Sequence, residues 1–178
     1  MIRPAPFLAL ALSVLPAPLL AQAPCLPLGG EIALCGDGTP WAGAQPVPIT
    51  DDDGVIAYEL PPLYLEASLE WLDARDARTP EAALVLMQDM LREEAAADGD
   101  PPPVRTLRDT IATDHASVAL DVYTEVFDGQ DYPLAVLLVA DGGGWLTLFL
   151  SGDEPMAAAT FEAEARALAG LLRPVPEG

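Results

Sequence analysis

The pattern of apolar and polar positions predicts two strands at the start of the main domain. Over residues 63–71, leucine, alanine or tryptophan at each odd position alternates with tyrosine, serine or glutamate at each even position. A period of two is typical of a strand with one face on the core and the other in water, so Trp71 is expected in the core. Residues 55–60 predict a second strand, which Pro61 and Pro62 end because proline cannot donate a backbone hydrogen bond.

Two segments show the spacing of amphipathic helices. The first begins at Thr79, a good N-cap residue, followed by Pro80 in the first helical position. Its apolar residues then recur at helical spacing as far as residue 98, where Gly99 ends the pattern. The second segment, residues 154–172, also keeps helical spacing and stops before a proline.

Four more strands are predicted between these helices, at residues 104–111, 118–126, 134–140 and 145–150. Residues 134–140 are apolar at every position, which is typical of a strand covered on both faces. Short connections make successive strands antiparallel. A strand that is apolar on both faces needs another layer of secondary structure packed against each face. The predicted fold class is therefore α+β, with an antiparallel sheet of about six strands flanked by helices in an α/β/α sandwich.

This order of elements resembles the fold of the PsbP family, which includes photosystem extrinsic subunits and DcrB-type bacterial envelope proteins. The resemblance is carried by the proline-stopped strand (YELPP, residues 58–62), the central helix, the three-strand meander and the closing helix. It covers residues 55–173 and depends on element order, not on a diagnostic motif. It implies a PsbP-like sandwich with an accessory or partner-binding role and no catalysis.

The N-terminal residues predict a secretory signal peptide. Arg3 precedes an apolar run of about nine residues, and small residues near Ala21 and Ala23 offer two alternative cleavage sites. The run is far shorter than the ~20 residues of a membrane-spanning helix. The predicted organisation is a signal peptide (1–23), an irregular disulfide-tied segment (24–54), a single α+β domain (55–173) and a tail (174–178). Export would place the mature chain in the periplasm or outside the cell.

The two cysteines, Cys25 and Cys35, are expected to form a disulfide, because an exported chain meets an oxidising compartment. Their spacing is not that of a C-x-x-C redox motif. The bond would fasten the glycine- and proline-rich segment 24–54, in which at most one short strand, residues 31–35, is expected. Trp41 is the one large side chain there, and it is either packed over the end of the sheet or exposed as an interface anchor.

Charge narrows the classes of partner. The chain has 28 Asp and Glu against 8 Lys and Arg, a formal net charge of −20, while hydrophobic residues make up 51% and allow a packed core. So acidic a surface repels phosphate, which argues against nucleic acid and against anionic lipid. It favours a basic partner, such as a basic envelope protein. The alternative, that acidity only keeps the protein dissolved, stays open.

Candidate chemistry is sparse. His115, the single histidine, stands between Asp114 and Ser117, but neighbours in a turn point in different directions and do not make a hydrolytic triad. The 141–144 loop lacks the lysine of a phosphate-binding loop.

Asp51, Asp52 and Asp53 are a weak calcium candidate, but they do not fit the EF-hand pattern, and a solvated turn before a strand explains them better. No cofactor and no catalytic residue is predicted. The predicted function is that of a non-catalytic exported domain binding another macromolecule. The alternatives are a protein that binds a small ligand or calcium between sheet and helix, and a hydrolase.

Overall fold

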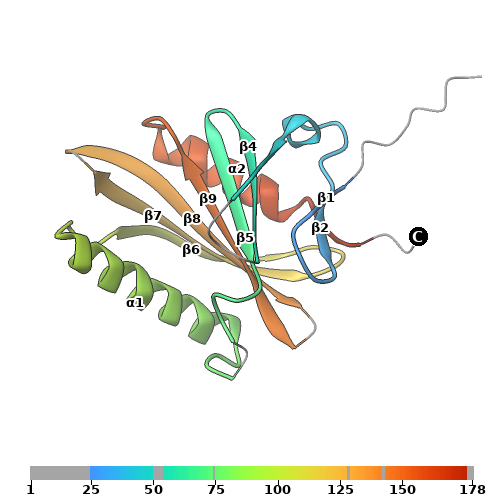
Figure 1. Ribbon diagram of the computed structural model, residues 1–178, viewed down its shortest axis with the longest axis horizontal. Helices are drawn as coiled ribbons and strands as arrows, with labels where there is room; N and C mark the ends of the chain where they lie inside the picture. The colour runs from blue at the N-terminus through green and yellow to red at the C-terminus, as the bar shows by residue number, and fades with distance from the viewer. Residues whose placement is uncertain (1–24, 50–53, 74, 128, 142, 176–178) are drawn as a thin grey trace, which may run out of the picture.

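The fold is built on a seven-stranded antiparallel sheet with the strand order β3-β4-β5-β9-β8-β7-β6 (Figure 1). The computed structural model describes residues 25–49, 54–73, 75–127, 129–141 and 143–175, so the predicted signal peptide and the Asp51–Asp53 cluster lie outside the described residues. The strands are β3 (Gln45–Val47), β4 (Val55–Leu60), β5 (Leu63–Ser68), β6 (Val104–Ala112), β7 (Ser117–Phe127), β8 (Gln130–Asp141) and β9 (Gly144–Gly152).

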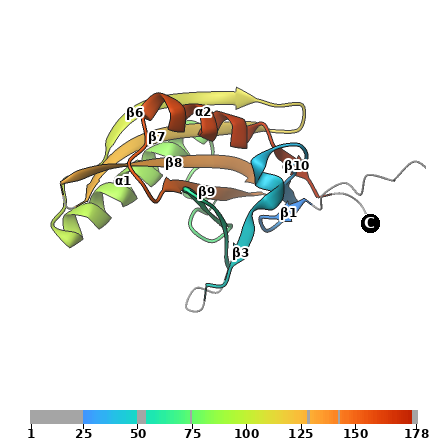
Figure 2. The same ribbon diagram turned by 90° about the horizontal axis from the view of Figure 1, so that it is seen from above.

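Strand β8 lies inside this sheet, paired with β7 and β9. Residues 134–139 are buried on both faces as predicted, whereas Ala140, the last residue of the predicted stretch, is exposed. Its side chains supply two separate cores. Leu134, Val136 and Leu138 pack on the side of helix α1 (Pro80–Asp98), and the alternate residues 135, 137 and 139 pack on the side of helix α2 (Ala158–Ala169). Figure 2 shows the two helices on opposite sides of the sheet. The α+β sandwich expected from the sequence is confirmed.

Helix α1 has the ends that its sequence predicts. The Thr79 hydroxyl accepts a hydrogen bond from the backbone N–H of Ala82 at 3.2 Å, and Pro80 occupies the first turn. Gly99 follows the last helical residue with a φ of 82°, a conformation that favours glycine.

Helix α2 is shorter than predicted at both ends. It begins at Ala158, three residues after Pro155, and ends at Ala169. The chain then turns into the short strand β10 (Leu172–Pro174), so the prediction that Leu172 lies in the helix is wrong. Leu168 and Leu172 have the spacing of one helix face. The backbone at residues 172–174 leaves the helix, however, because it pairs with another strand.

That partner is β2 (Ile32–Leu34), the centre of a second sheet with the order β1-β2-β10, in which β1 is Leu26–Pro27. The predicted Cys25–Cys35 disulfide closes this unit, with 4.3 Å between the two Cα atoms. Residues 25–49 therefore hold three strands and a short 3-10 helix, Pro40–Gly43, where at most one strand was expected. Strands of two or three residues are too short for alternation to reveal them.

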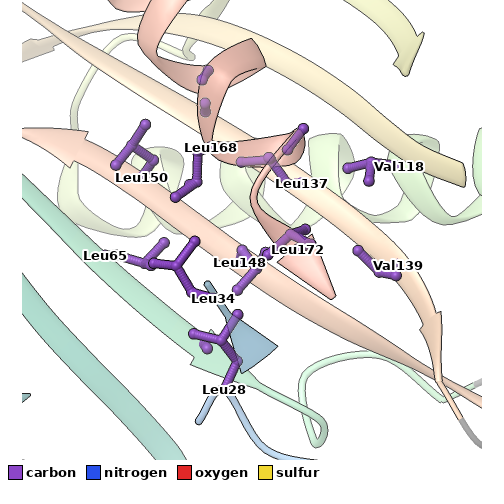
Figure 3. Packing of buried hydrophobic residues seen from close by; sticks show 14 of the residues in the cluster. Leu28, Leu34, Leu65, Val118, Leu137, Val139, Leu148, Leu150, Leu168 and Leu172 are labelled. Carbon is purple, nitrogen blue, oxygen red and sulfur yellow. The ribbon is translucent and has the colours of Figure 1, made fainter. Parts of the chain in front are cut away.

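The disulfide-tied segment is part of the main core. Leu28 and Leu34 lie beside Leu65 and Leu148 of the large sheet, as Figure 3 shows. Trp41 is only 3% exposed, so of the two interpretations, packing in the core is confirmed and the exposed interface anchor is wrong. Its indole completes the apolar layer on the α2 side of the sheet.

Trp71 does not lie in the core as predicted. Strand β5 ends at Ser68, whose hydroxyl accepts a hydrogen bond from the backbone N–H of Glu70 and turns the chain away from the sheet. The alternation is broken at that turn: Leu69 becomes exposed, and Trp71 lies half-buried against Phe149 on the other face of the sheet.

A buried ion pair lies between the sheet and α1. Asp121 of β7 is fully buried, and Arg108 of the edge strand β6 donates to it from Nε at 2.7 Å and also from Nη2. The Tyr123 hydroxyl donates to the same carboxylate at 2.8 Å, and Arg105 donates to Gln88 of α1 at 3.1 Å. Burial and this hydrogen bond raise the pKa of Tyr123, so the phenol stays protonated as a donor.

We expect Arg108→Met to lower the free energy of unfolding by about 3 kcal/mol, because it leaves the Asp121 charge buried without its main partner. The double variant with Asp121→Asn should recover much of that loss. Urea unfolding of the wild type and both variants measures it. Equal midpoints for all three would contradict this role.

Replacing Cys25 and Cys35 together with serine should lower the unfolding free energy by about 2–3 kcal/mol, because the bond restricts the unfolded chain. Guanidinium unfolding measures the loss, and reductant added to the wild type should reproduce it. A midpoint unaffected by reductant would refute this contribution.

Candidate functional site

A groove of about 460 Å³ lies between the C-terminal half of α1 and the adjoining face of the sheet. Helix α1 packs mainly on β7 and β8, so beside it the same face of β5 and β9 contributes side chains to the groove. The connector at residues 100–103 closes one end. The volume lies within the range of about 300–1,000 Å³ that small-molecule sites occupy.

The floor of the groove is apolar and partly aromatic. Trp71 and Phe149 pack with ring centroids 4.9 Å apart and planes inclined at 56°, next to Leu134 of β8. At the edge, Met90 is 44% exposed and Phe127 is 60% exposed. Exposed large apolar side chains that gather around one hollow are typical of a contact surface.

Every charged residue that lines the groove is acidic. The five are Glu66, Glu94, Asp98, Asp100 and Glu125. The chain has no lysine. Within the described ranges, the ion pairs of arginine use other acids, among them Asp73, Asp89 and Asp121. Glu94, Asp98, Asp100 and Glu125 therefore have no arginine partner among the residues that the structure describes.

Glu125 is a half-buried carboxyl of this set. Burial raises its pKa, and the negative charge of Glu94 on α1 raises it further. Burial also raises the pKa of Tyr64, and so does the neighbouring Glu66, so this phenol is a protonated donor at the mouth of the groove. The site thus combines an apolar floor, the hydroxyls of Tyr64 and Ser151, and carboxylates of which Glu66 and Glu125 are half-buried.

Local sequence patterns explain which side chains meet here. Met87, Leu91, Glu94 and Asp98 recur at intervals of three or four and share one face of α1. Tyr64 and Glu66 are the polar alternates of β5, predicted to face water. The small-ligand alternative placed a pocket between sheet and helix but identified none of these residues, because their only signal in the sequence is an acidic and aromatic polar face.

The residues that the sequence did single out are not brought together. Asp114 and His115 lie in the exposed β6–β7 turn, where the backbone N–H of His115 donates to the Thr113 hydroxyl at 3.2 Å, and Ser117 is the exposed first residue of β7. No hydrogen bond joins the side chains of these three residues, all of which the structure describes. The Asp141 carboxylate accepts the backbone N–H of Glu31 at 3.2 Å and joins the two sheets.

Among the described residues, no group of three or more His, Cys, Asp or Glu side chains is arranged to hold a metal ion. Neither of the two described α-helices combines the length and the apolar character needed to cross a bilayer.

Comparison with known proteins gives remote structural likenesses alone. No protein-family model matches the chain, and no curated protein matches it. A solved structure of the Pseudomonas aeruginosa protein PA94, described as of unknown function, is similar with a TM-score of 0.43 and 18% identity. The similarity covers 76% of this chain and 98% of that one.

Glu125→Gln should raise the melting temperature at neutral pH. Because the pKa of Glu125 is raised in the folded state, its stabilising contribution is complete below the unfolded value near 4.5 and is lost as pH rises through the folded pKa. The gain of the variant should therefore be absent near pH 4 and grow toward pH 7.

Thermal unfolding across that pH range measures the effect. Glu93→Gln is the control, since it removes an exposed carboxylate of α1 outside the groove and should leave the pH profile unchanged. A Glu125→Gln profile parallel to that of the wild type would argue against a desolvated carboxyl.

Proposed function

We propose that this chain is a non-catalytic exported domain that binds a basic protein of the cell envelope. The observation that carries the proposal is the groove, in which an apolar floor is surrounded by carboxylates and no cation of the protein lines the wall. Such a surface complements a partner that presents apolar and positively charged side chains together.

Two further observations support this proposal. The disulfide between Cys25 and Cys35 is typical of an extracytoplasmic compartment. The net charge of −20 attracts a basic partner over distances beyond direct contact and accelerates encounter. The groove then adds an apolar contact to that attraction, which acidity serving only to keep the protein dissolved would not require.

A short peptide that alternates leucine and arginine is a suitable probe. We expect it to bind at low ionic strength (about 0.02 M) and to bind at least about tenfold more weakly near 0.5 M, since salt screens exposed charges. Isothermal titration measures the affinity. A leucine–glutamate peptide is the matched control and should not bind. No binding of the basic peptide at low salt, or equal binding of both peptides, would refute the proposal.

A small apolar cation is the second candidate ligand, favoured by the volume of about 460 Å³. In the same titration, benzylammonium tests this candidate. If it binds as tightly as the basic peptide, the groove itself carries the recognition and a protein partner is not needed.

A further inference from the structure

We infer that the groove recognises a guanidinium group of its partner, held between Glu125 and Glu94 and stacked on the Trp71–Phe149 pair. This inference rests on the proposed function and deepens it, because it names the chemical group that is bound and the side chains that bind it. It requires a partner segment in which arginine stands beside apolar residues.

The two carboxylates come from opposite walls. Glu125 lies near the end of β7 and Glu94 lies on α1, and both line the same groove. Neither takes part in an ion pair within the described residues, although five other acids of the chain do so with arginine. Glu125 is half-buried and Glu94 is exposed. The two carboxylates are close enough that the charge of Glu94 raises the pKa of Glu125, and a cation placed between them removes that repulsion.

The floor favours guanidinium over other cations. The tilted Trp71 and Phe149 rings form an aromatic surface beside Leu134, within the same groove as the acids. A guanidinium is planar and weakly hydrated, so it stacks on aromatic rings while donating hydrogen bonds to carboxylates in its plane. Ammonium is more strongly hydrated and gains less from such a surface.

The exposed edge of the groove indicates a peptide segment as the occupant. Met90 and Phe127 extend the apolar surface outward at the mouth, where they can contact the residues on either side of an inserted arginine. A metal ion would gain nothing from these side chains or from the aromatic floor.

The test is titration of the leucine–arginine peptide into Glu125→Gln, Glu94→Gln and the control Glu93→Gln. Loss of a charge-assisted hydrogen bond predicts about 10- to 100-fold weaker binding for each of the first two variants. The control, which removes the same charge from the same helix outside the groove, should bind within about twofold of the wild type. Glu125→Gln is expected to be more stable than the wild type at neutral pH, so its weaker binding would not reflect unfolding.

Tryptophan emission gives a second measurement. Trp41 and Trp145 are buried, so a change in emission on binding should come from Trp71 and should disappear in Trp71→Phe. A leucine–lysine peptide should bind at least about threefold more weakly than the arginine peptide.

The outcomes separate this inference from the proposed function. If the arginine peptide binds but all three glutamine variants bind alike, the domain is a binder of basic partners and the groove assignment is wrong. If the lysine and arginine peptides bind equally, the guanidinium assignment is wrong. If the arginine peptide does not bind the wild type, both proposals fail.

Discussion

The burial of β8 on both faces is the constraint on which the other elements depend. Six consecutive side chains from Leu134 to Val139 are apolar and inaccessible, three on each side of the sheet. At about 25 cal/mol for each Å² of apolar surface removed from water, exposing either row would cost several kcal/mol. Each face therefore needs a cover, and α1 and α2 provide it.

Polar contacts then determine where α1 lies on its face. Before the helix begins, the Trp145 indole N–H donates to the Ala77 carbonyl at 2.9 Å. At the middle of the helix, Gln88 accepts from Arg105, which lies beside the buried Arg108–Asp121 pair on β6 and β7. Both attachments precede the C-terminal half of α1. That half is left with the groove on one side, so the contacts that order the helix also create the candidate site.

Much of the fold could be predicted from the sequence, because long elements carry clear local signals. The continuous apolar run 134–140 identifies β8, and Thr79 and Gly99 mark the ends of α1. Elements that depend on distant partners were not predictable in this way. Strand β10 forms because β2 lies beside it, and Trp71 leaves the core because a turn at Ser68 ends the alternation.

The residues that line the groove escaped prediction for a related reason. Alternation shows correctly that Asp121, Tyr123 and Glu125 share one face of β7, but it predicts that this polar face is wet. In the structure α1 covers it. Whether such a face is solvated or buried is a tertiary property, since the same sequence of alternating residues suits both. The sequence therefore identifies which charged residues share this face of β7, but it does not show that α1 covers them.

Two acidic residues on this face of β7 differ in whether a cation of the protein compensates their charge. Asp121 is fully buried and is compensated by Arg108, with Tyr123 as a further donor. Glu125, four residues further along β7, is half-buried without an ion pair among the described residues. An arginine opposite Glu125 would compensate it in the same way and would make the helix–sheet contact more stable. It would also fill the groove with a cation of the protein itself, so the negative site would no longer attract one from a partner. The uncompensated Glu125 therefore fits the proposed binding of a cation and not a role in stabilising the fold.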